Sequence, residues 1–308
     1  MPDRQPILVT GSHRSGTGWV GRMIAATPSP QIAYLWEPFS LLHRPGICDA
    51  AFPYWFPYVC EENASVFRPS IADTLAFRYK TGAELRVVRT PQDAARLVRD
   101  RARFRRYRRQ SAVPLMKDPI AVFSAEWLCD TFDMHVLMLI RHPAAFVYSI
   151  RQRGWTHPFD HFLAQPLLMR DFLLPFEREI QTFAAREHSP FEQGILLWKL
   201  IHSAILRFRT NRPDFMFLRL EDIARDPVAA FRALYARLDL TFTNEVMATI
   251  AAHSDVSNPA TTASLDDVRR DSRASVVAWK AGITAEEAEH IRTDVEQLSK
   301  EFYSDEDW

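Results

Sequence analysis

A glycine-punctuated segment near the start of the chain constrains its fold most. Residues 7–10 read Ile-Leu-Val-Thr, an apolar and mostly β-branched run that is typical of a buried parallel strand. Two glycines five positions apart follow, Gly11 and Gly16, and residues 19–26 then predict a helix. A strand, a glycine-rich turn and a helix direct several backbone N–H groups and the positive helix end at one point. The segment therefore predicts an α/β fold with an anion-binding loop.

The rest of the chain alternates strand and helix patterns. Strands are predicted over 32–35, 134–140 and 215–220, and helices over 90–110, 144–151, 191–209, 227–238 and 284–302. This alternation predicts one α/β domain over residues 1–308, with a central, mainly parallel sheet flanked by helices, as in P-loop NTPases. Ligands of such folds bind at the carboxyl ends of the strands.

Composition excludes several classes of protein. Of the 308 residues, 47% are apolar and 25% charged, which is typical of a globular protein, and no apolar run is long enough to span a membrane. The three cysteines form no CxxC pair, which argues against a disulfide framework or a zinc site. The first residues lack the pattern of a secretory leader, so a cytoplasmic protein is predicted. The 38 basic residues balance 38 acidic ones, which argues against a general nucleic-acid binder.

The glycine loop differs from the loop of ATP-binding proteins at one position. In those loops a lysine follows the second glycine and contacts the β- and γ-phosphates, but here Thr17 follows Gly16. Arg14 instead places a cation inside the loop. The pattern favours binding of a phosphate-like anion and weakens an ATPase or kinase interpretation, while a simple turn between strand and helix remains open.

A second motif follows the predicted strand at 134–140. Arg141 stands at the end of this strand, and Ser149 lies eight residues later on the following helix. An arginine at a strand's carboxyl end can make bidentate contacts with a phosphate, and a serine hydroxyl can add a further bond. Taken alone, the pair is also compatible with a capping arginine and a serine that packs against a neighbouring helix.

Together the two motifs resemble those of the PAPS-dependent sulfotransferase family, in particular members of the bacterial carbohydrate or metabolite type. PAPS is 3′-phosphoadenosine-5′-phosphosulfate. The resemblance implies that Arg141 and Ser149 bind the 3′-phosphate of the donor. Position 18 departs from the family pattern, because many members have Thr where this chain has Gly. The residues that match the family's 5′-phosphosulfate loop are Arg14, Ser15, Gly16, Thr17, Gly18 and Trp19.

Three weaker segments also resemble the family, at 116–119, 219–227 and 272–284. The last resembles the segment that covers the nucleotide and suggests Arg273 as a donor-binding residue, although the Lys-Gly that usually follows is absent. The resemblance implies transfer of a sulfuryl group from PAPS to a hydroxyl, or less readily an amine, of a carbohydrate or other small-molecule acceptor, releasing PAP without a metal. Residues 41–115, rich in proline and aromatic residues in their first part, would form an insertion or lid on the acceptor side.

Three roles in the chemistry of transfer have candidate residues, and two residues compete for one of these roles. Glu37 follows the predicted strand at 32–35 and matches the place of the base in tyrosylprotein and glycosaminoglycan sulfotransferases. His43 is a rival base, and a surface carboxylate is the alternative for Glu37. Arg14 would neutralise the leaving group, and Lys117 would stabilise the transferring group or else pair with Asp118.

Two further segments and two other functions stay open. The arginine-rich residues 99–109 suggest either an anionic acceptor or a solvated helix face, and residues 52–58 suggest an aromatic acceptor wall or a small core under a loop. The alternatives to sulfotransfer are an ATP- and Mg²⁺-dependent P-loop phosphotransferase and a non-catalytic nucleotide-binding scaffold.

Overall fold

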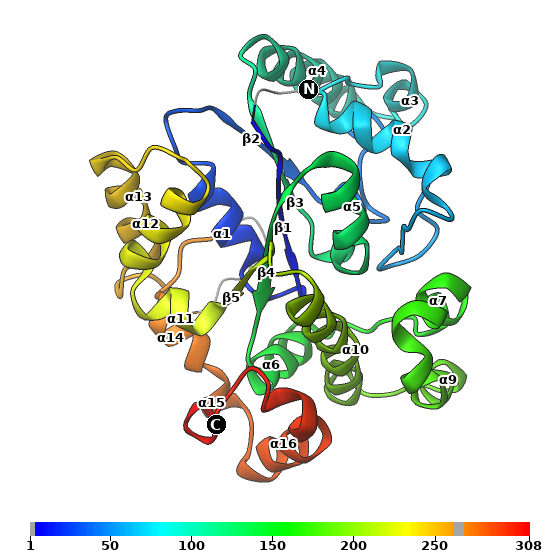
Figure 1. Cartoon of the computed structure of the whole chain (residues 1–308), viewed down its shortest axis with the longest axis vertical. Coiled ribbons are helices and arrows are strands. Elements are labelled where there is room, and N and C mark those ends of the chain that lie inside the picture. The colour runs from blue at the N-terminus through cyan, green and yellow to red at the C-terminus, as the bar shows by residue number, and fades with distance from the viewer. Residues whose placement is uncertain (1–3, 261–267) are drawn as a thin grey trace.

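A parallel sheet forms the centre of the molecule. The structure is a computed structural model, and it describes residues 4–260 and 268–308. Within them, five parallel strands pair in the order β2-β3-β1-β4-β5, with helices on both faces (Figure 1). The predicted α/β class and parallel sheet are confirmed. The strands are β1 (Ile7–Gly11), β2 (Ile32–Trp36), β3 (Val113–Lys117), β4 (His135–Ile140) and β5 (Met216–Arg219).

The helices fill the segments between and after the strands. Short 3-10 turns are η1 (Pro119–Ser124), η3 (Leu174–Phe176) and η4 (Asp305–Asp307), and η2 (Met169–Leu173) is a π-turn. None of the described helices is long and apolar enough to cross a membrane. The α-helices are α1 (Thr17–Ile24), α2 (Ala64–Leu75), α3 (Thr81–Leu85), α4 (Pro91–Arg109), α5 (Ala125–Phe132), α6 (Pro143–Arg153), α7 (Asp160–Leu163), α8 (Pro166–Leu168), α9 (Glu177–Ala185), α10 (Pro190–Asn211), α11 (Leu220–Arg225), α12 (Pro227–Arg237), α13 (Asn244–Ser254), α14 (Ser272–Val277), α15 (Trp279–Gly282) and α16 (Ala285–Ser299).

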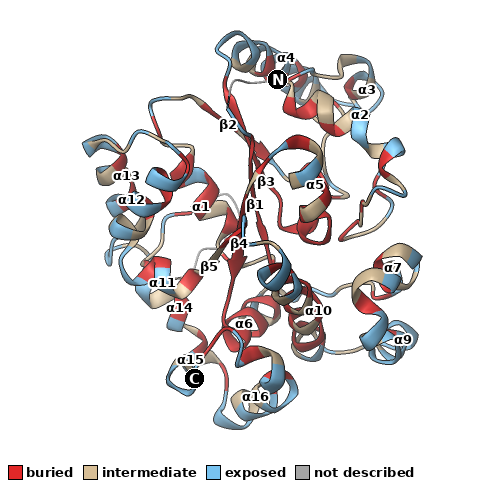
Figure 2. Cartoon of the chain, in the orientation of Figure 1, coloured by how far each residue is buried: buried red, intermediate tan, exposed pale blue. Residues whose placement is uncertain are grey.

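Both faces of the sheet are buried, and alternate strand residues supply two separate cores. Leu8 and Met138 point into the core shared with α5, α6 and α10, whereas Val9 and Leu137 point into the core shared with α1 and α12. The strands are accordingly buried along most of their length, and the helices are exposed on their outer faces (Figure 2). This explains why the strands read as continuous apolar runs rather than as alternating ones.

Strand β3 was not predicted from the sequence, because Pro114 sits inside it. A proline cannot donate a ladder hydrogen bond and is rare in interior strands. Here the N–H of Val113 donates to the Gln31 carbonyl at 2.8 Å, toward β2, so the nitrogen of Pro114 faces the other side. On that side the pairing with β1 begins only at Leu115. The proline therefore interrupts no bond.

The first part of residues 41–115 is irregular, as its proline and aromatic content predicted, and the second part forms α2, α3 and α4. The region packs on the core through Phe52 and Phe56, so its aromatic loop is at least partly a core element. Buried Glu84 pairs with Arg44 and accepts the N–H of Gly46 at 2.8 Å, which ties the loop to α3. Its role as an acceptor-side lid stays a prediction.

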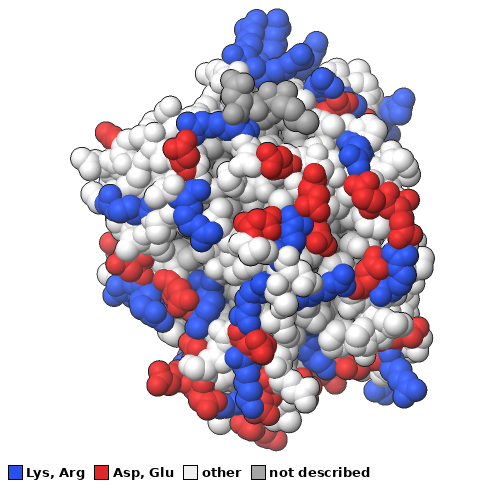
Figure 3. Space-filling view, in the orientation of Figure 1, with Lys and Arg blue, Asp and Glu red and all other residues white. Residues whose placement is uncertain are grey.

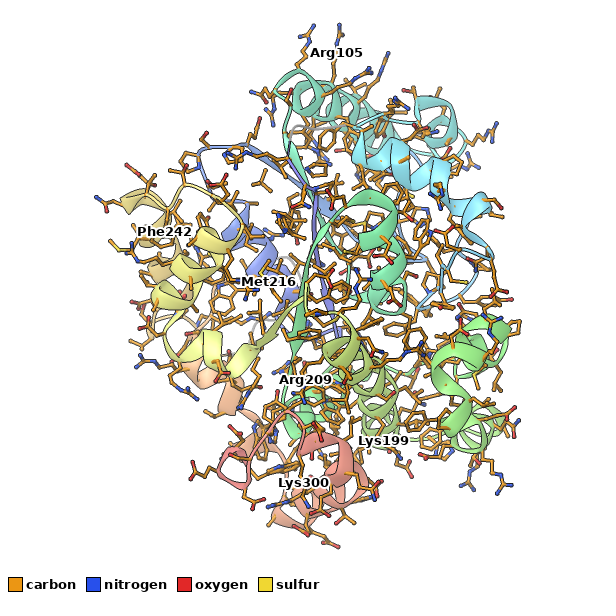
Figure 4. The ribbon with its side chains drawn as sticks, in the orientation of Figure 1. Arg105, Lys199, Arg209, Met216, Phe242 and Lys300 are labelled. Carbon is orange, nitrogen blue, oxygen red and sulfur yellow. The ribbon has the colours of Figure 1, made fainter. Side chains whose placement is uncertain are left out.

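The arginine run at 99–109 lies on α4, which leads into the amino end of β3. Arg105 points outward from α4 at the end of the molecule where the strands begin (Figures 1 and 4). Lysine and arginine side chains gather at this end in the space-filling view (Figure 3). The loop between β1 and α1 lies at the opposite, carboxyl ends of the strands, so the run is separated from it by the length of the sheet.

Candidate active site

The loop between β1 and α1 closes tightly because of its two glycines. Gly11 has φ +125°, and a Cβ at this position would overlap the backbone carbonyl of Leu139 on β4. Gly16 has φ +84° and is the N-cap residue of α1. Both conformations favour glycine, since L side chains are strained at positive φ. The loop therefore ends at the N-terminus of α1, and the helix end would stabilise an anion bound there.

The two sequence motifs meet at this loop. Arg14, at φ 64°, directs its side chain to α6, where its Nε donates to the Ser149 hydroxyl at 3.0 Å. Arg141, at the end of β4, donates from Nη1 to the backbone carbonyl of Arg14. These two hydrogen bonds join Arg14 to residues that lie 127 and 135 positions later in the sequence, so the three side chains form one cluster. The two motifs therefore meet at the carboxyl ends of β1 and β4, where parallel sheets place their ligands.

The cluster carries an excess of positive charge. Burial, and then the nearby cations Arg141, Arg270 and Arg153, lower the pKa of Arg14 to about 9. Burial lowers the pKa of Arg141 to about 10, against an opposing effect of Glu221. The Nε of Arg141 is buried and has no hydrogen-bond partner among the described residues. Buried charges of the same sign repel one another, and an anionic ligand that accepts the unused hydrogen bond would stabilise them.

The backbone at Arg141 and His142 is supported by three side chains, of which only Glu221 lies in a segment that resembled the family in sequence. The indole Nε1 of Trp198, on α10, donates to the Arg141 carbonyl at 2.9 Å. The next backbone N–H, of His142, donates to Glu221 at 3.0 Å, and the Tyr303 hydroxyl donates to the other oxygen of Glu221 at 3.1 Å. These contacts join α10, α11 and the segment after α16, so no local pattern could reveal them.

A cavity of about 700 Å³ opens at the carboxyl ends of the strands. Each strand contributes to its lining at or just after its carboxyl end, which is the expected ligand position in a parallel sheet. Arg14 and Arg141 of the cluster also line this cavity, whereas Ser149 does not; Gly16 to Trp19 and residues before and within α14 complete this part of the lining. The strand-end residues are His13, Trp36, Lys117, Arg141 and Leu220.

Glu37 and Lys117 lie at the ends of the neighbouring strands β2 and β3 and line the same cavity. The Lys117 ammonium donates to Glu37 Oε1, and the two side chains are 7% and 18% exposed. Lys117 therefore pairs with Glu37 and not with Asp118, the partner considered from sequence. Since a carboxylate has two oxygens, Oε2 can still take a proton from a bound ligand.

Asp118 bonds to the backbone just after Glu37 and just after Lys117. Its fully buried carboxylate accepts the N–H of Phe39 at 2.6 Å and the N–H of Ile120 at 3.0 Å. Burial first, and then the charge of Glu37, raise the pKa of Asp118 to about 8. Asp118 thus couples the turn after Glu37 to the turn after Lys117.

Some residues named from sequence lie elsewhere. Arg273 does not line the cavity; its Nε donates to the Arg225 carbonyl at 3.0 Å. His43 is also outside the lining, with Nδ1 2.5 Å from the Ser40 carbonyl oxygen. Ser15 bonds within the loop, to the Ser12 carbonyl. The ligand contacts of these residues stay predictions. Lining residues missed from sequence include Arg270 and His253.

Comparison with known proteins identifies the family. A family model described as "Sulfotransferase family" matches residues 6–245, which is most of the chain. The chain belongs to the sulfotransferase family, as its motifs predicted. A search with the sequence finds no match among curated proteins.

A search of solved structures matches the chain to sulfotransferases, at low identity and with TM-scores below 0.5. The sulfotransferase domain from the curacin biosynthetic pathway is 14% identical, with a TM-score of 0.48 and coverage of 96% of this chain and 99% of that one. Mouse sulfotransferase SULT7A1 complexed with PAP is 12% identical, with a TM-score of 0.47 and coverage of 98% and 87%. The sulfotransferase from Alicyclobacillus acidocaldarius is 16% identical, with a TM-score of 0.43 and coverage of 98% and 97%.

Proposed function

We propose that the protein transfers a sulfuryl group from PAPS to a hydroxyl group of a small-molecule acceptor. The observation that carries this proposal is the junction of the two motifs: Arg14 bonds to Ser149 and Arg141 bonds to Arg14, so the cations for both phosphate ends of one nucleotide lie together. The unpartnered Nε of Arg141 fits a 3′-phosphate, and the loop at the N-terminus of α1 fits the 5′-phosphosulfate.

The bound donor supplies the sulfuryl group: the bond from sulfur to the bridging phosphate oxygen breaks, a bond to the acceptor oxygen forms, and PAP leaves. Glu37 accepts the acceptor's hydroxyl proton on its free oxygen. Arg14 lies in the loop and neutralises charge that develops on the leaving phosphate, and Lys117 stabilises charge on the transferring group. Because Lys117 also bonds to Glu37, the same ammonium orients the base and faces the reaction centre.

An ATP- and Mg²⁺-dependent phosphotransferase fits the site less well. Thr17 stands where such enzymes place the lysine for the β- and γ-phosphates, and the cations here come from Arg14 and from the distant Arg141. The proposal therefore assigns the loop to a phosphosulfate rather than to a triphosphate.

Transfer of label tests this function. The protein is incubated with PAPS labelled in its sulfur and, separately, with Mg²⁺ and ATP labelled in its γ-phosphate, each with the same set of aromatic, aliphatic and sugar alcohols. We expect labelled sulfate ester only from PAPS, and loss of this product in Arg14→Ala. Transfer from ATP, or binding of PAP without any transfer, would support the phosphotransferase or the scaffold instead.

A further inference from the structure

Part of the cavity lining consists of aromatic side chains, here called the aromatic wall. Trp36 ends β2, Trp55 and Phe56 come from the irregular loop before α2, and Trp155 follows α6; all four line the cavity. Phe56 is 2% exposed and packs on Phe123 and Phe162, so the core holds its ring in position.

Two tryptophans of this wall and one leucine of the lining are exposed to solvent. Trp36 is 44% exposed, Trp155 37% and Leu42 71%, and these three are among the few large hydrophobic side chains that the described surface leaves open. All three line the cavity. Apolar surface that stays open at the rim of a cavity marks a place where a ligand covers it.

The two exposed tryptophans stand beside the groups proposed to carry out the transfer. The Lys117 ammonium lies 5.5 Å from the centre of the Trp36 ring, and Trp36 immediately precedes Glu37. The Arg14 guanidinium lies 5.6 Å from the centre of the Trp155 ring. An acceptor in contact with both indoles therefore has its hydroxyl near the base and near the loop that holds the donor.

The wall offers little to a polyhydroxylated acceptor. Of the cations in the lining, Arg14 and Arg141 are assigned to the donor and Lys117 bonds to Glu37. Among the described lining residues Glu37 is the one carboxylate, and none is Asn or Gln. Hydroxyl groups of a sugar would lose water without gaining enough partners. His13 and His157 also belong to the lining. Burial lowers the pKa of both imidazoles, that of His13 to about 3, so these two lining side chains carry no charge.

We infer that the acceptor is an uncharged, planar aromatic alcohol, held between Trp36 and Trp155, which set the specificity of the site. The inference rests on the proposed function and narrows it, because it sets aside the sugar acceptor that the family resemblance alone allowed. Ring contacts and burial of apolar surface provide the affinity for the aromatic part of the acceptor, and hydrogen bonding of its hydroxyl orients it in the site.

Calorimetric titration of the protein saturated with PAP tests this inference. The probes are 2-naphthol, the non-planar alcohol cyclohexanol and methyl β-glucoside. We expect 2-naphthol to bind at least about tenfold more tightly than either of the others. Trp36→Ala and Trp155→Ala should each weaken 2-naphthol about tenfold and leave the affinity for PAP unchanged, and the Phe variants at these positions should recover part of the loss.

Leu174→Ala is the matched control, because Leu174 is a 59% exposed apolar side chain outside the lining. It should change neither affinity. The inference is overturned if the glucoside binds as well as 2-naphthol, if the PAP complex binds none of the probes, or if the tryptophan variants bind 2-naphthol as the parent does. Failure of PAP itself to bind is a different result: it rejects the proposed function, and the inference falls with it.

Discussion

At the scale of single residues, the pairing of Glu37 with Lys117 joins two functions that the sequence suggested separately. Each residue ends its strand, and the parallel pairing of β2 with β3 brings the two side chains together. Sequence order could place each at a carboxyl end, but their contact depends on β3, whose register was not predicted. The same dependence explains Arg273: a short resemblance suggested a ligand contact, whereas the folded chain directs its Nε to Arg225.

Substitution of the proposed base separates chemistry from binding. Glu37→Gln keeps the size of the side chain but removes its basicity, so we expect the rate of sulfuryl transfer to fall by about 10²- to 10⁴-fold while the affinity for PAP stays within about twofold. Glu286→Gln, on exposed α16, is the control. Turnover by Glu37→Gln at the parent rate would remove Glu37 from the role of base and return attention to His43.

At the scale of elements, the β1–loop–α1 unit was the best determined from sequence. Local sequence patterns determine its strand, its glycines and its helix. The predicted ends of the strand and of the helix lie within two residues of the observed ends. What escaped prediction depends on long-range packing: β3 with its internal proline, and the support of Arg141 by Trp198 and Tyr303. Both require partners that are distant in sequence, so no local pattern contains them.

The close contact between this loop and β4 can be tested through Gly11. Gly11→Ala forces a Cβ against the Leu139 carbonyl at a positive φ, and we expect the free energy of unfolding to fall by about 2–4 kcal/mol. Gly82→Ala, on α3, has no atom within 4 Å of its added Cβ and should be neutral or stabilising by up to about 1 kcal/mol. Urea unfolding of both variants measures the difference. Equal stability of the two would show that β1 and β4 do not approach as described.

At the scale of the whole molecule, buried neutral histidines make stability depend on pH. Burial lowers the pKa of fully buried His202 to about 3, against 6.5 for a free imidazole. The stability that His202 contributes is therefore complete above pH 6.5 and is lost as the pH falls from 6.5 toward 3. Buried Asp118 acts in the opposite sense, because its raised pKa of about 8 makes its contribution complete below pH 4 and lost as the pH rises toward 8.

A single substitution isolates the histidine effect. Between pH 6.5 and 5, His202→Leu should reduce the dependence of unfolding free energy on pH by about 1 kcal/mol per pH unit on average, rising toward the value of about 1.4 that corresponds to one proton. Leu174→Ala, at an exposed position, is the control: it removes no titratable group and should leave the slope unchanged. Urea unfolding at several pH values gives both slopes, and parallel curves for His202→Leu and the parent would mean that His202 is accessible to protons in the folded state.

The central claim is that Arg141 and the loop around Arg14 hold the two phosphate ends of one nucleotide. Calorimetric titration with PAP and with AMP, which lacks the 3′-phosphate, tests it most directly in the parent, in Arg141→Ala and in the exposed control Arg105→Ala. We expect the parent and the control to bind PAP about a hundredfold more tightly than AMP, and Arg141→Ala to lose most of this preference while its affinity for AMP stays nearly unchanged. Equal affinities of the parent for PAP and AMP, or an unchanged preference in Arg141→Ala, would contradict the account.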